Sequence, residues 1–336
     1  MRIYDCGFAY GLFCLYIRNL KSDIRNKITL VILKKTILIT GGTGLIGRHL
    51  CSRLDEKGYS VALLSRNKIS GSRYPVFLWN PRTGEVDPHA LNGISTIIHL
   101  AGAGIGDQRW SEHRKKEIID SRVNSAMALL KEVKQQGIAL KTFISSSATG
   151  YYGAVTSGRI FTEECQPSDD FLGTTCRLWE EAADRFSEAG ARVVKIRTGI
   201  VLSREGGALP KMTLPVKFGI STVPGNGKQW LPWIHLLDLC DIYVKVLEDN
   251  SLSGAYNAVA PEPASMKEFM KEAAKALKRP FLPFPVPAFI LKTLLGEMAS
   301  LLTEGSRVSS EKIRKAGFEF RFPLLKDALH HVFKNG

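Results

Sequence analysis

The fold is decided by the stretch Ile37–Gly47, which reads ILITGGTGLIG. A short apolar run with strand character leads directly into glycines spaced G-x-x-G-x-x-G, and an amphipathic helix pattern follows at once. This order of strand, glycine turn and helix is typical of a dinucleotide-binding turn, whose helix start offers free N–H groups and a partial positive charge to phosphates. The residues of the turn that we expect to contact a dinucleotide are Gly41, Thr43, Gly44, Leu45, Ile46 and Gly47.

Strand and helix patterns alternate from residue 36 to about residue 200, which predicts an α/β fold with a Rossmann-type doubly wound parallel sheet. The expected strands are Thr36–Thr40, Ser60–Ser65, Thr96–Leu100, Thr142–Ser146 and Arg192–Arg197. The expected helices cover Leu45–Lys57, a long segment from a cap at Ser111 to about Gln136, and roughly Gly173–Ala189.

After residue 200 the pattern changes, because glycine and proline become frequent. We assign residues 36–200 to the nucleotide-binding domain, 201–279 to a substrate-side part of the same domain, and 280–333 to a smaller, mainly helical C-terminal subdomain. The sequence Ser265–Glu268 is a capping box that predicts a helix to about Leu277. Further helices are predicted at Ala288–Leu302, Ser309–Ala316 and Leu324–Phe333.

Composition limits the classes of protein to consider. The chain has 336 residues, of which 44% are hydrophobic, and its six cysteines contain no C-x-x-C pair. Scattered cysteines indicate free thiols in a reducing compartment, so we expect a cytoplasmic protein without a metal site. The net charge is +14, but the basic residues form no dense run with interleaved aromatics, so nucleic-acid binding is not expected.

Residues 1–35 are expected to lie outside the fold. They hold seven basic and two acidic side chains, a net charge of +5, around an apolar segment, Phe8–Ile17, that is too short to span a bilayer. We interpret them as an upstream extension rather than as a membrane-surface anchor, the alternative that their composition leaves open.

The end of the second predicted strand indicates which dinucleotide binds. NAD-binding units usually carry an acidic residue there, which bonds the ribose 2′-hydroxyl and would repel a 2′-phosphate. This chain has Ser65 and Arg66, a hydroxyl and a guanidinium that can bind a phosphate. The expected cofactor is therefore NADP(H); the alternative is that Arg66 is an ordinary solvated arginine.

The ends of later strands supply further candidate residues, because ligands of open α/β sheets bind at the carboxyl ends of the strands. Small residues at Leu100–Gly102 would let a cofactor lie close to the backbone, and Ser145 begins a hydroxyl-rich segment. Arg197 ends the next strand and is expected near the nicotinamide. The residues expected to line the cofactor site at these strand ends are Leu100, Ala101, Gly102, Ser145 and Arg197.

Taken together, these motifs resemble the extended short-chain dehydrogenases/reductases, and more narrowly the atypical branch known only as epimerase family proteins. The segments that carry the narrower resemblance are Arg109-Trp110, Trp179-Glu180, Pro232–His235 with Asp238, and Gly317–Pro323. The resemblance implies a Rossmann fold, NADP(H) binding, Glu117 and Arg122 at the cofactor site, a C-terminal domain of unknown function, and the homodimers common in that family.

The chain departs from the family at its chemistry. Typical members carry Tyr-x-x-x-Lys at the start of the helix that follows the serine-rich segment. There the tyrosine exchanges a proton, and the lysine lowers the pKa of the tyrosine and holds the ribose. Aligning the helix on Glu180 puts Leu172 at the tyrosine position and Cys176 at the lysine position. Neither side chain can perform the missing role.

Three other side chains are candidate acid/bases: Tyr151, Tyr152 and His235. The alternative interpretation of His235 is a hydrogen-bonded structural histidine. We expect either an NADP(H)-dependent oxidoreductase or epimerase acting on an unknown carbonyl or hydroxyl substrate, or a non-catalytic NADP(H)-binding regulator, a role that fits the loose association of some family members with division. A homodimer is compatible with both, and membrane contact is not expected.

Overall fold

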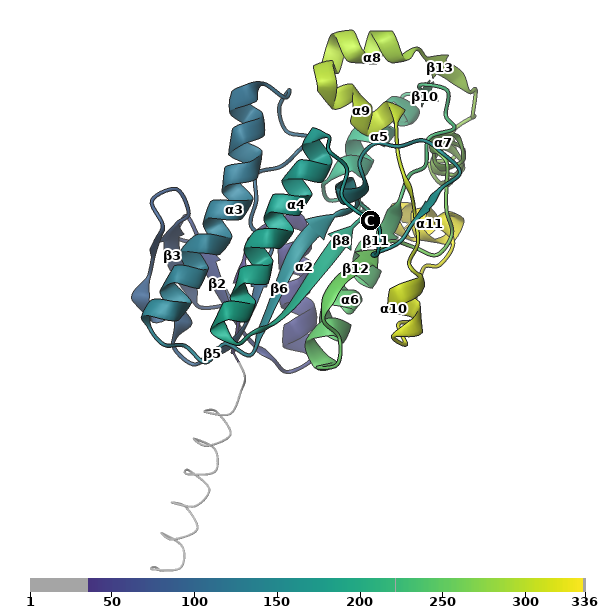
Figure 1. Cartoon of the computed structure of the whole chain (residues 1–336). Helices are drawn as coiled ribbons and strands as arrows, with labels where there is room; N and C mark the ends of the chain where they lie inside the picture. The colour runs from purple at the N-terminus through teal and green to yellow at the C-terminus, as the bar shows by residue number, and fades with distance from the viewer. Residues whose placement is uncertain (1–35, 221, 335–336) are drawn as a thin grey trace, which may run out of the picture.

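The computed structural model describes residues 36–220 and 222–334, so the predicted extension 1–35 lies outside the described part. One sheet of eight strands organises the fold, in the order β12-β8-β6-β5-β1-β2-β3-β4 (Figure 1). Every neighbouring pair is parallel except β3 and β4. The strands are β1 (Thr36–Thr40), β2 (Ser60–Ser65), β3 (Val76–Asn80), β4 (Glu85–Val86), β5 (Ile94–His99), β6 (Thr142–Ala148), β8 (Arg192–Thr198) and β12 (Gly254–Ala258).

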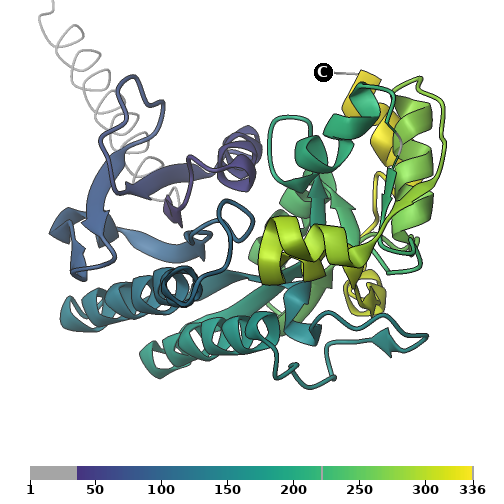
Figure 2. The same cartoon turned by 90° about the horizontal axis from the view of Figure 1, so that it is seen from above.

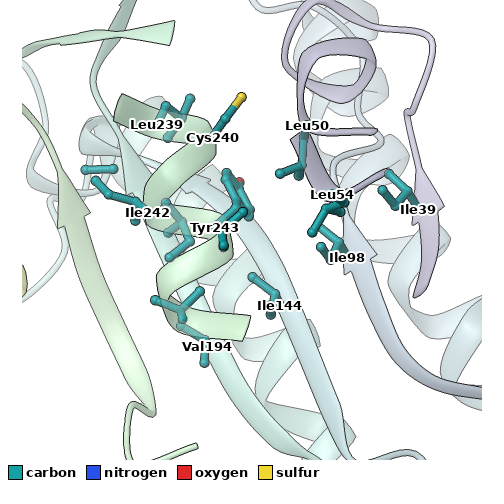
Figure 3. Packing of buried hydrophobic residues seen from close by; sticks show 14 of the residues in the cluster. Ile39, Leu50, Leu54, Ile98, Ile144, Val194, Leu239, Cys240, Ile242 and Tyr243 are labelled. Atoms are coloured by element: carbon teal, nitrogen blue, oxygen red, sulfur yellow. The ribbon is translucent and has the colours of Figure 1, made fainter. Parts of the chain in front are cut away.

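Helices cover both faces of the sheet, which confirms the doubly wound fold. The helices α2 (Leu45–Glu56) and α6 (Leu236–Glu248) pack side by side on one face, where their apolar side chains meet those of the central strands (Figure 3). The other face is covered by α3 (Glu112–Gln135) and α4 (Phe171–Asp184). Each central strand is therefore buried on both sides, which explains its nearly continuous apolar sequence.

The sheet extends beyond the expected elements at both edges. At one edge lie β3 and β4, which are absent from the expected strands, although Val76–Trp79 is an apolar run; β3 is mostly exposed or half-buried and β4 has only two residues. At the other edge, β12 and its covering helix α6 come after residue 200, where we expect the nucleotide-binding domain to end. The sheet therefore crosses that boundary.

A third apolar core holds the remaining part of the chain together. It lies between α5 (Ala208–Lys217), α7 (Met266–Ala276) and α11 (Leu325–Lys334). The capping box is present, since Ser265 accepts a hydrogen bond from the Glu268 amide while the Glu268 carboxylate accepts one from the Ser265 amide. The chain after residue 280, for which a mainly helical structure is predicted, is indeed mainly helical.

Short elements complete the C-terminal part. The predicted helix Ala288–Leu302 is broken into α8 (Ala288–Leu295), a 3-10 turn and α9 (Ser300–Thr303), because Gly296 adopts a left-handed conformation with φ of 64°. The other elements are the paired strands β9 (Ile200–Leu202) and β11 (Trp233–His235), β10 (Thr222–Pro224) and β13 (Phe284–Val286), β7 (Ile160–Phe161) and β14 (Arg307–Val308), and the helix α10 (Glu311–Lys315). Within the described ranges, every helix is too short or too polar to cross a membrane.

Candidate functional site

A cleft of about 730 Å³ opens at the carboxyl ends of β1, β2 and β5. Figure 2 looks down on this edge of the molecule. A doubly wound sheet binds ligands at this edge, where the strand order reverses on either side of β1. The lining residues are Gly41–Gly44, Leu63–Asn67, Trp79–Arg82, Leu100–Ala103, His113, Lys116, Glu117, Asp120, Ser121 and Asn124.

The glycine turn forms one wall of the cleft and fits a dinucleotide. Gly41 has φ of 70°, and a Cβ there would lie 2.9 Å from the carbonyl carbon of Leu100. A Cβ on Gly47 would lie 2.3 Å from the Gly41 oxygen, so only glycine allows α2 to start this close to the turn. α2 begins after Gly44 with no side-chain cap and no acidic residue in its first turn, which leaves its N–H groups for an anionic ligand.

The end of β2 brings a cation to the same cleft. Arg66 is exposed and makes no ion pair with a carboxylate anywhere in residues 36–220 and 222–334. Ser65 is half-buried beside it, and its hydroxyl accepts a hydrogen bond of 3.3 Å from the Asn67 amide. No acidic side chain follows β2, so the polar groups here suit an anion.

The third wall comes from α3. Glu117 lies 2.7 Å from Arg114 and 3.7 Å from Arg82, and the hydrogen bond from Arg114 is the main reason why the pKa of Glu117 is lowered. Sequence reasoning missed Arg82 and Trp79, because they belong to the unexpected strand β3 and the loop after it. It also missed Lys116 and Asn124, although Asn124 lies seven residues after Glu117 and therefore on the same face of the predicted helix.

The structure gathers nine of the fifteen expected cofactor residues around this cleft. The six that are not among its lining residues are Leu45, Ile46, Gly47, Arg122, Ser145 and Arg197. Leu45 and Ile46 are partly buried against the core, and Gly47 is packed behind the turn, so these three can offer backbone N–H groups only. Ser145 is buried, and its hydroxyl donates to the Ser146 carbonyl. The expected residues that line the cleft are Gly41, Thr43, Gly44, Ser65, Arg66, Leu100, Ala101, Gly102 and Glu117.

Arg197 does not face the cleft, which corrects its predicted role. Its guanidinium is almost fully buried and pairs with both carboxylate oxygens of Glu180 at 2.8 and 2.9 Å. It also donates to the Tyr152 hydroxyl at 3.0 Å. Glu180 in turn accepts a hydrogen bond of 2.7 Å from Ser147. The arginine is therefore the centre of a buried polar network that ties α4 to β6 and β8.

The same network removes Tyr152 as an acid/base. Tyr152 is 1% exposed, and its hydroxyl also donates to Asn257 at 2.7 Å. Burial raises its pKa beyond the ordinary range of a phenol. Tyr151 differs: it is half-buried, and the guanidinium carbon of Arg197 lies 3.5 Å from the centre of its ring. Burial is the main cause that raises the pKa of Tyr151, and the neighbouring Arg197 opposes the shift.

His235 is a structural histidine, which also corrects its proposed catalytic role. It is 3% exposed, its Nδ1 accepts a hydrogen bond from the Leu237 amide, and its Nε2 lies 3.1 Å from Nδ1 of His331. Phe322 stacks on its ring. Burial lowers its pKa to about 3, so it stays neutral. Both ring nitrogens connect elements of the fold, and neither faces the cleft.

The positions that normally carry the tyrosine and lysine are closed to chemistry. Leu172 is 9% exposed and Cys176 is 4% exposed. Burial raises the pKa of the Cys176 thiol to about 12, which leaves it neutral and unreactive near pH 7. The structure therefore agrees with the sequence that the tyrosine and lysine of the family motif have no substitute at these two positions.

Comparisons with known proteins agree with this architecture. A family model described as the NAD dependent epimerase/dehydratase family matches residues 37–258. The chain belongs to this family. A second model, described as a domain of unknown function (DUF1731), matches residues 286–332, in the region assigned to the C-terminal subdomain.

Two proteins named as epimerase family proteins are similar over most of their length. The chain is 38% identical to YfhF of Bacillus subtilis over 298 residues, which are 88% of this chain and 97% of the relative. The crystal structure of human SDR39U1 (isoform 2) with NADPH is 31% identical, with a TM-score of 0.80, and the match covers 90% of this chain and 100% of that one. The predicted resemblance to epimerase family proteins is confirmed.

More distant structures share the fold alone. The UDP-glucose 4-epimerase of Thermus thermophilus, solved in complex with NAD, is 19% identical with a TM-score of 0.72, covering 90% of this chain and 99% of that one. At 19% identity the likeness shows the fold alone, so the nucleotide-sugar substrate of that enzyme is not assigned to this chain.

Proposed function

We propose that this protein binds NADP(H) in the cleft and uses it in an oxidoreductase or epimerase reaction on a carbonyl or hydroxyl substrate. The observation that carries the proposal is Arg66, an exposed guanidinium without an ion-pair partner in the described part of the chain, at the end of β2 where NAD-binding units usually carry an acid. The human relative crystallised with NADPH supports the choice of the phosphorylated cofactor.

In this proposal, the residues of the cleft divide the binding of the cofactor between them. The glycine turn and the first N–H groups of α2 bind the pyrophosphate, while Ser65 and Arg66 bind the 2′-phosphate. Leu100–Gly102 offer a small-residue wall beside the ribose. The bound nicotinamide would supply a hydride donor or acceptor.

Tyr151 is the side chain that we propose for proton transfer. Tyr152 and His235 are buried with their polar atoms in use, whereas Tyr151 is half-buried beside the Arg197 guanidinium. Because its pKa is raised, the phenol stays protonated at neutral pH, which suits a general acid toward a developing alkoxide.

Isothermal titration with NADPH and NADH tests the cofactor assignment. The wild type is expected to prefer NADPH, and Arg66→Asp should weaken NADPH binding about 100-fold, because a charge-assisted contact is replaced by repulsion. NADH binding should change little. Equal losses for both cofactors would refute the 2′-phosphate role of Arg66.

A second candidate function is a regulator that binds NADP(H) without turnover, and the buried Leu172 and Cys176 favour it. Incubation with NADPH and a panel of carbonyl compounds, followed by cofactor absorbance, separates the two functions. Turnover that is lost in Tyr151→Phe supports the enzyme. Tight NADPH binding without turnover on any compound of the panel supports the regulator.

A further inference from the structure

A second cavity, of about 430 Å³, lies at the β12 edge of the sheet. It is formed by β7, the loop after β12, β14 and α10, and α10 lies beside β12 (Figure 1). Its lining residues all differ from those of the cofactor cleft, which opens beyond β6 and β8 at the ends of β1, β2 and β5. The two cavities are therefore separate places in the fold.

The backbone of this second cavity is fixed by the fold. Strand β14 pairs with β7, which places Arg307 opposite Ile160. After the strand, the Ser309 amide donates a hydrogen bond of 2.9 Å to the Phe161 carbonyl. The Ser309 carbonyl accepts a hydrogen bond of 3.0 Å from Nδ2 of Asn257 on β12. The backbone that carries the lining side chains is thus held in place before a ligand binds, which reduces the cost of binding.

Positive charge predominates in the second cavity. Three cations, Arg307, Arg314 and Lys315, line it together with one carboxylate, that of Glu311. Nζ of Lys315 lies 2.8 Å from Oε1 of Glu311, and this hydrogen bond is the main reason why the pKa of Glu311 is lowered, with a smaller contribution from Arg314. Lys315 therefore balances the carboxylate. Neither arginine forms an ion pair with a carboxylate among the residues that the structure describes, so two guanidinium charges remain for a ligand.

Arg307 is packed against an indole ring. Its guanidinium carbon lies 5.0 Å from the centre of the Trp230 ring. Nε1 of Trp230 donates a hydrogen bond of 2.9 Å to the Ser157 carbonyl, which fixes the indole. Stacking of this kind orients a guanidinium and leaves the N–H groups along its edge available for an oxyanion.

The remaining wall of the second cavity is apolar. Pro261 and Pro263 line it after β12, and neither offers a backbone N–H group. Ile160 lines it from β7 and is 48% exposed, so its apolar surface is free to contact a ligand. An occupant that matches both walls carries an apolar group as well as a negative charge.

We propose that the second cavity binds a small phosphate monoester, whose phosphate is held by Arg307 and Arg314. Its apolar group lies against Pro261, Pro263 and Ile160. Two guanidiniums without carboxylate partners suit a phosphate, which carries up to two negative charges at neutral pH and three oxygens that accept hydrogen bonds. The volume of about 430 Å³ lies in the range of small-molecule sites. The inference goes beyond the proposed use of NADP(H), whose phosphates are assigned to the cofactor cleft.

Phenyl phosphate is the probe that tests this site, because it joins a phosphate to a flat apolar ring. In calorimetric titration, the wild type should bind phenyl phosphate at millimolar concentration, and more tightly than inorganic phosphate. Arg307→Gln and Arg314→Gln should each weaken this binding roughly 10-fold or more, as expected for a lost charged hydrogen bond. Arg185→Gln, at an exposed position outside both cavities, is the matched control and should leave the affinity unchanged.

Arg66→Gln distinguishes the two cavities, because the cofactor cleft also offers a cation to a phosphate. Phenyl phosphate binding should persist in Arg66→Gln, and NADPH binding should persist in Arg307→Gln. If phenyl phosphate binding is instead lost in Arg66→Gln and kept in Arg307→Gln, the anion lies in the cofactor cleft and the inference is overturned. A wild type that binds phenyl phosphate through Arg307 but does not bind NADPH would support this site and refute the proposed function.

Three other results would also overturn the inference. The first is a wild type that binds no phenyl phosphate. The second is equal affinity for phenyl phosphate and inorganic phosphate, which would remove the role of the apolar wall. The third is a phosphoserine peptide that binds more tightly than phenyl phosphate, which would make the ligand a protein. Arg314 is exposed, so Arg314→Gln keeps the test decisive even if the loss of stacking on Trp230 unfolds Arg307→Gln.

Discussion

The hydroxyl of Thr40 donates a hydrogen bond of 2.8 Å to Nδ1 of His99. The direction follows from the partners, because the same oxygen accepts the amides of Leu100 and Ala101 at 3.2 Å each. Nε2 of His99 then carries the proton and donates to the Ser125 hydroxyl at 3.1 Å, and that hydroxyl donates to a backbone carbonyl of α3. Neutral His99 thus ties β1, β5 and α3 together beside the glycine turn.

This arrangement predicts a loss of stability in mild acid. Burial lowers the pKa of His99 to about 4, below the value of 6.5 expected in the unfolded chain. Between these pH values the unfolded chain binds the extra proton, so the contribution of neutral His99 is complete above pH 6.5 and declines as the pH falls toward 4. From pH 7 to pH 5, His99 should cost about 2 kcal/mol of unfolding free energy. Urea unfolding at several pH values measures the slope.

A variant isolates the share of His99 in that slope. His99→Asn is less stable at pH 7 but removes the titrating ring, so its unfolding free energy should fall less steeply between pH 7 and pH 5. Part of the slope should remain, because His235 is also held neutral, with a pKa lowered by burial to about 3. A slope identical to that of the wild type would contradict the role assigned to His99.

The nucleotide-binding part of this structure can be predicted from short stretches of sequence. The contacts of the other candidate residues cannot, because they join residues that are far apart in the chain. The glycine turn and the Ser65-Arg66 pair each lie at the end of one strand, so a short window shows both the element and its chemistry. The sequence gives no sign of where Arg197 lies, because its partner Glu180 is on α4 and only the packing of α4 against β8 buries the two side chains together. The His235–His331 contact spans 96 residues, a distance over which sequence patterns give no signal.

The buried pair of Glu180 and Arg197 should contribute more to the unfolding free energy than the exposed ion pairs of α4 do. Glu180→Gln keeps the shape of the side chain but leaves the guanidinium without its carboxylate, which should cost about 3 kcal/mol of unfolding free energy. The neighbouring Glu181 pairs with Arg177 on the surface, so Glu181→Gln should cost less than about 1 kcal/mol. Urea unfolding of both variants at pH 7 measures the contrast, and equal effects would show that the buried network is not stabilising.

Gly47 should not accept even a methyl group. A Cβ there would lie 2.3 Å from the Gly41 oxygen, a backbone atom that cannot move without changing the turn. Gly47→Ala should therefore lower the unfolding free energy by about 1–3 kcal/mol, as overpacking does, and weaken NADPH binding more than tenfold. Gly158→Ala is the matched control, because a Cβ at Gly158 meets open space and its backbone is not left-handed. Thermal melting and calorimetric titration give the two readouts.

Tyr151 and Tyr152 are adjacent, yet we expect the Tyr152 hydroxyl to stabilise the fold and the Tyr151 hydroxyl to donate a proton. Removing the Tyr152 hydroxyl leaves Asn257 and Arg197 each short of a buried hydrogen bond, so Tyr152→Phe should cost about 1–3 kcal/mol of unfolding free energy. Tyr151→Phe should cost less stability, because Tyr151 is only half-buried and Arg197 keeps its two contacts with Glu180. It should leave NADPH affinity almost unchanged and reduce turnover about 100-fold or more on any substrate that the panel identifies. The reverse pattern, with turnover lost in Tyr152→Phe and kept in Tyr151→Phe, would remove Tyr151 as the proton donor. Burial raises the pKa of Tyr151 above the ordinary value for a phenol, which is about 10. Reductive turnover should therefore persist at neutral pH and fall only above about pH 10, as the phenol loses its proton.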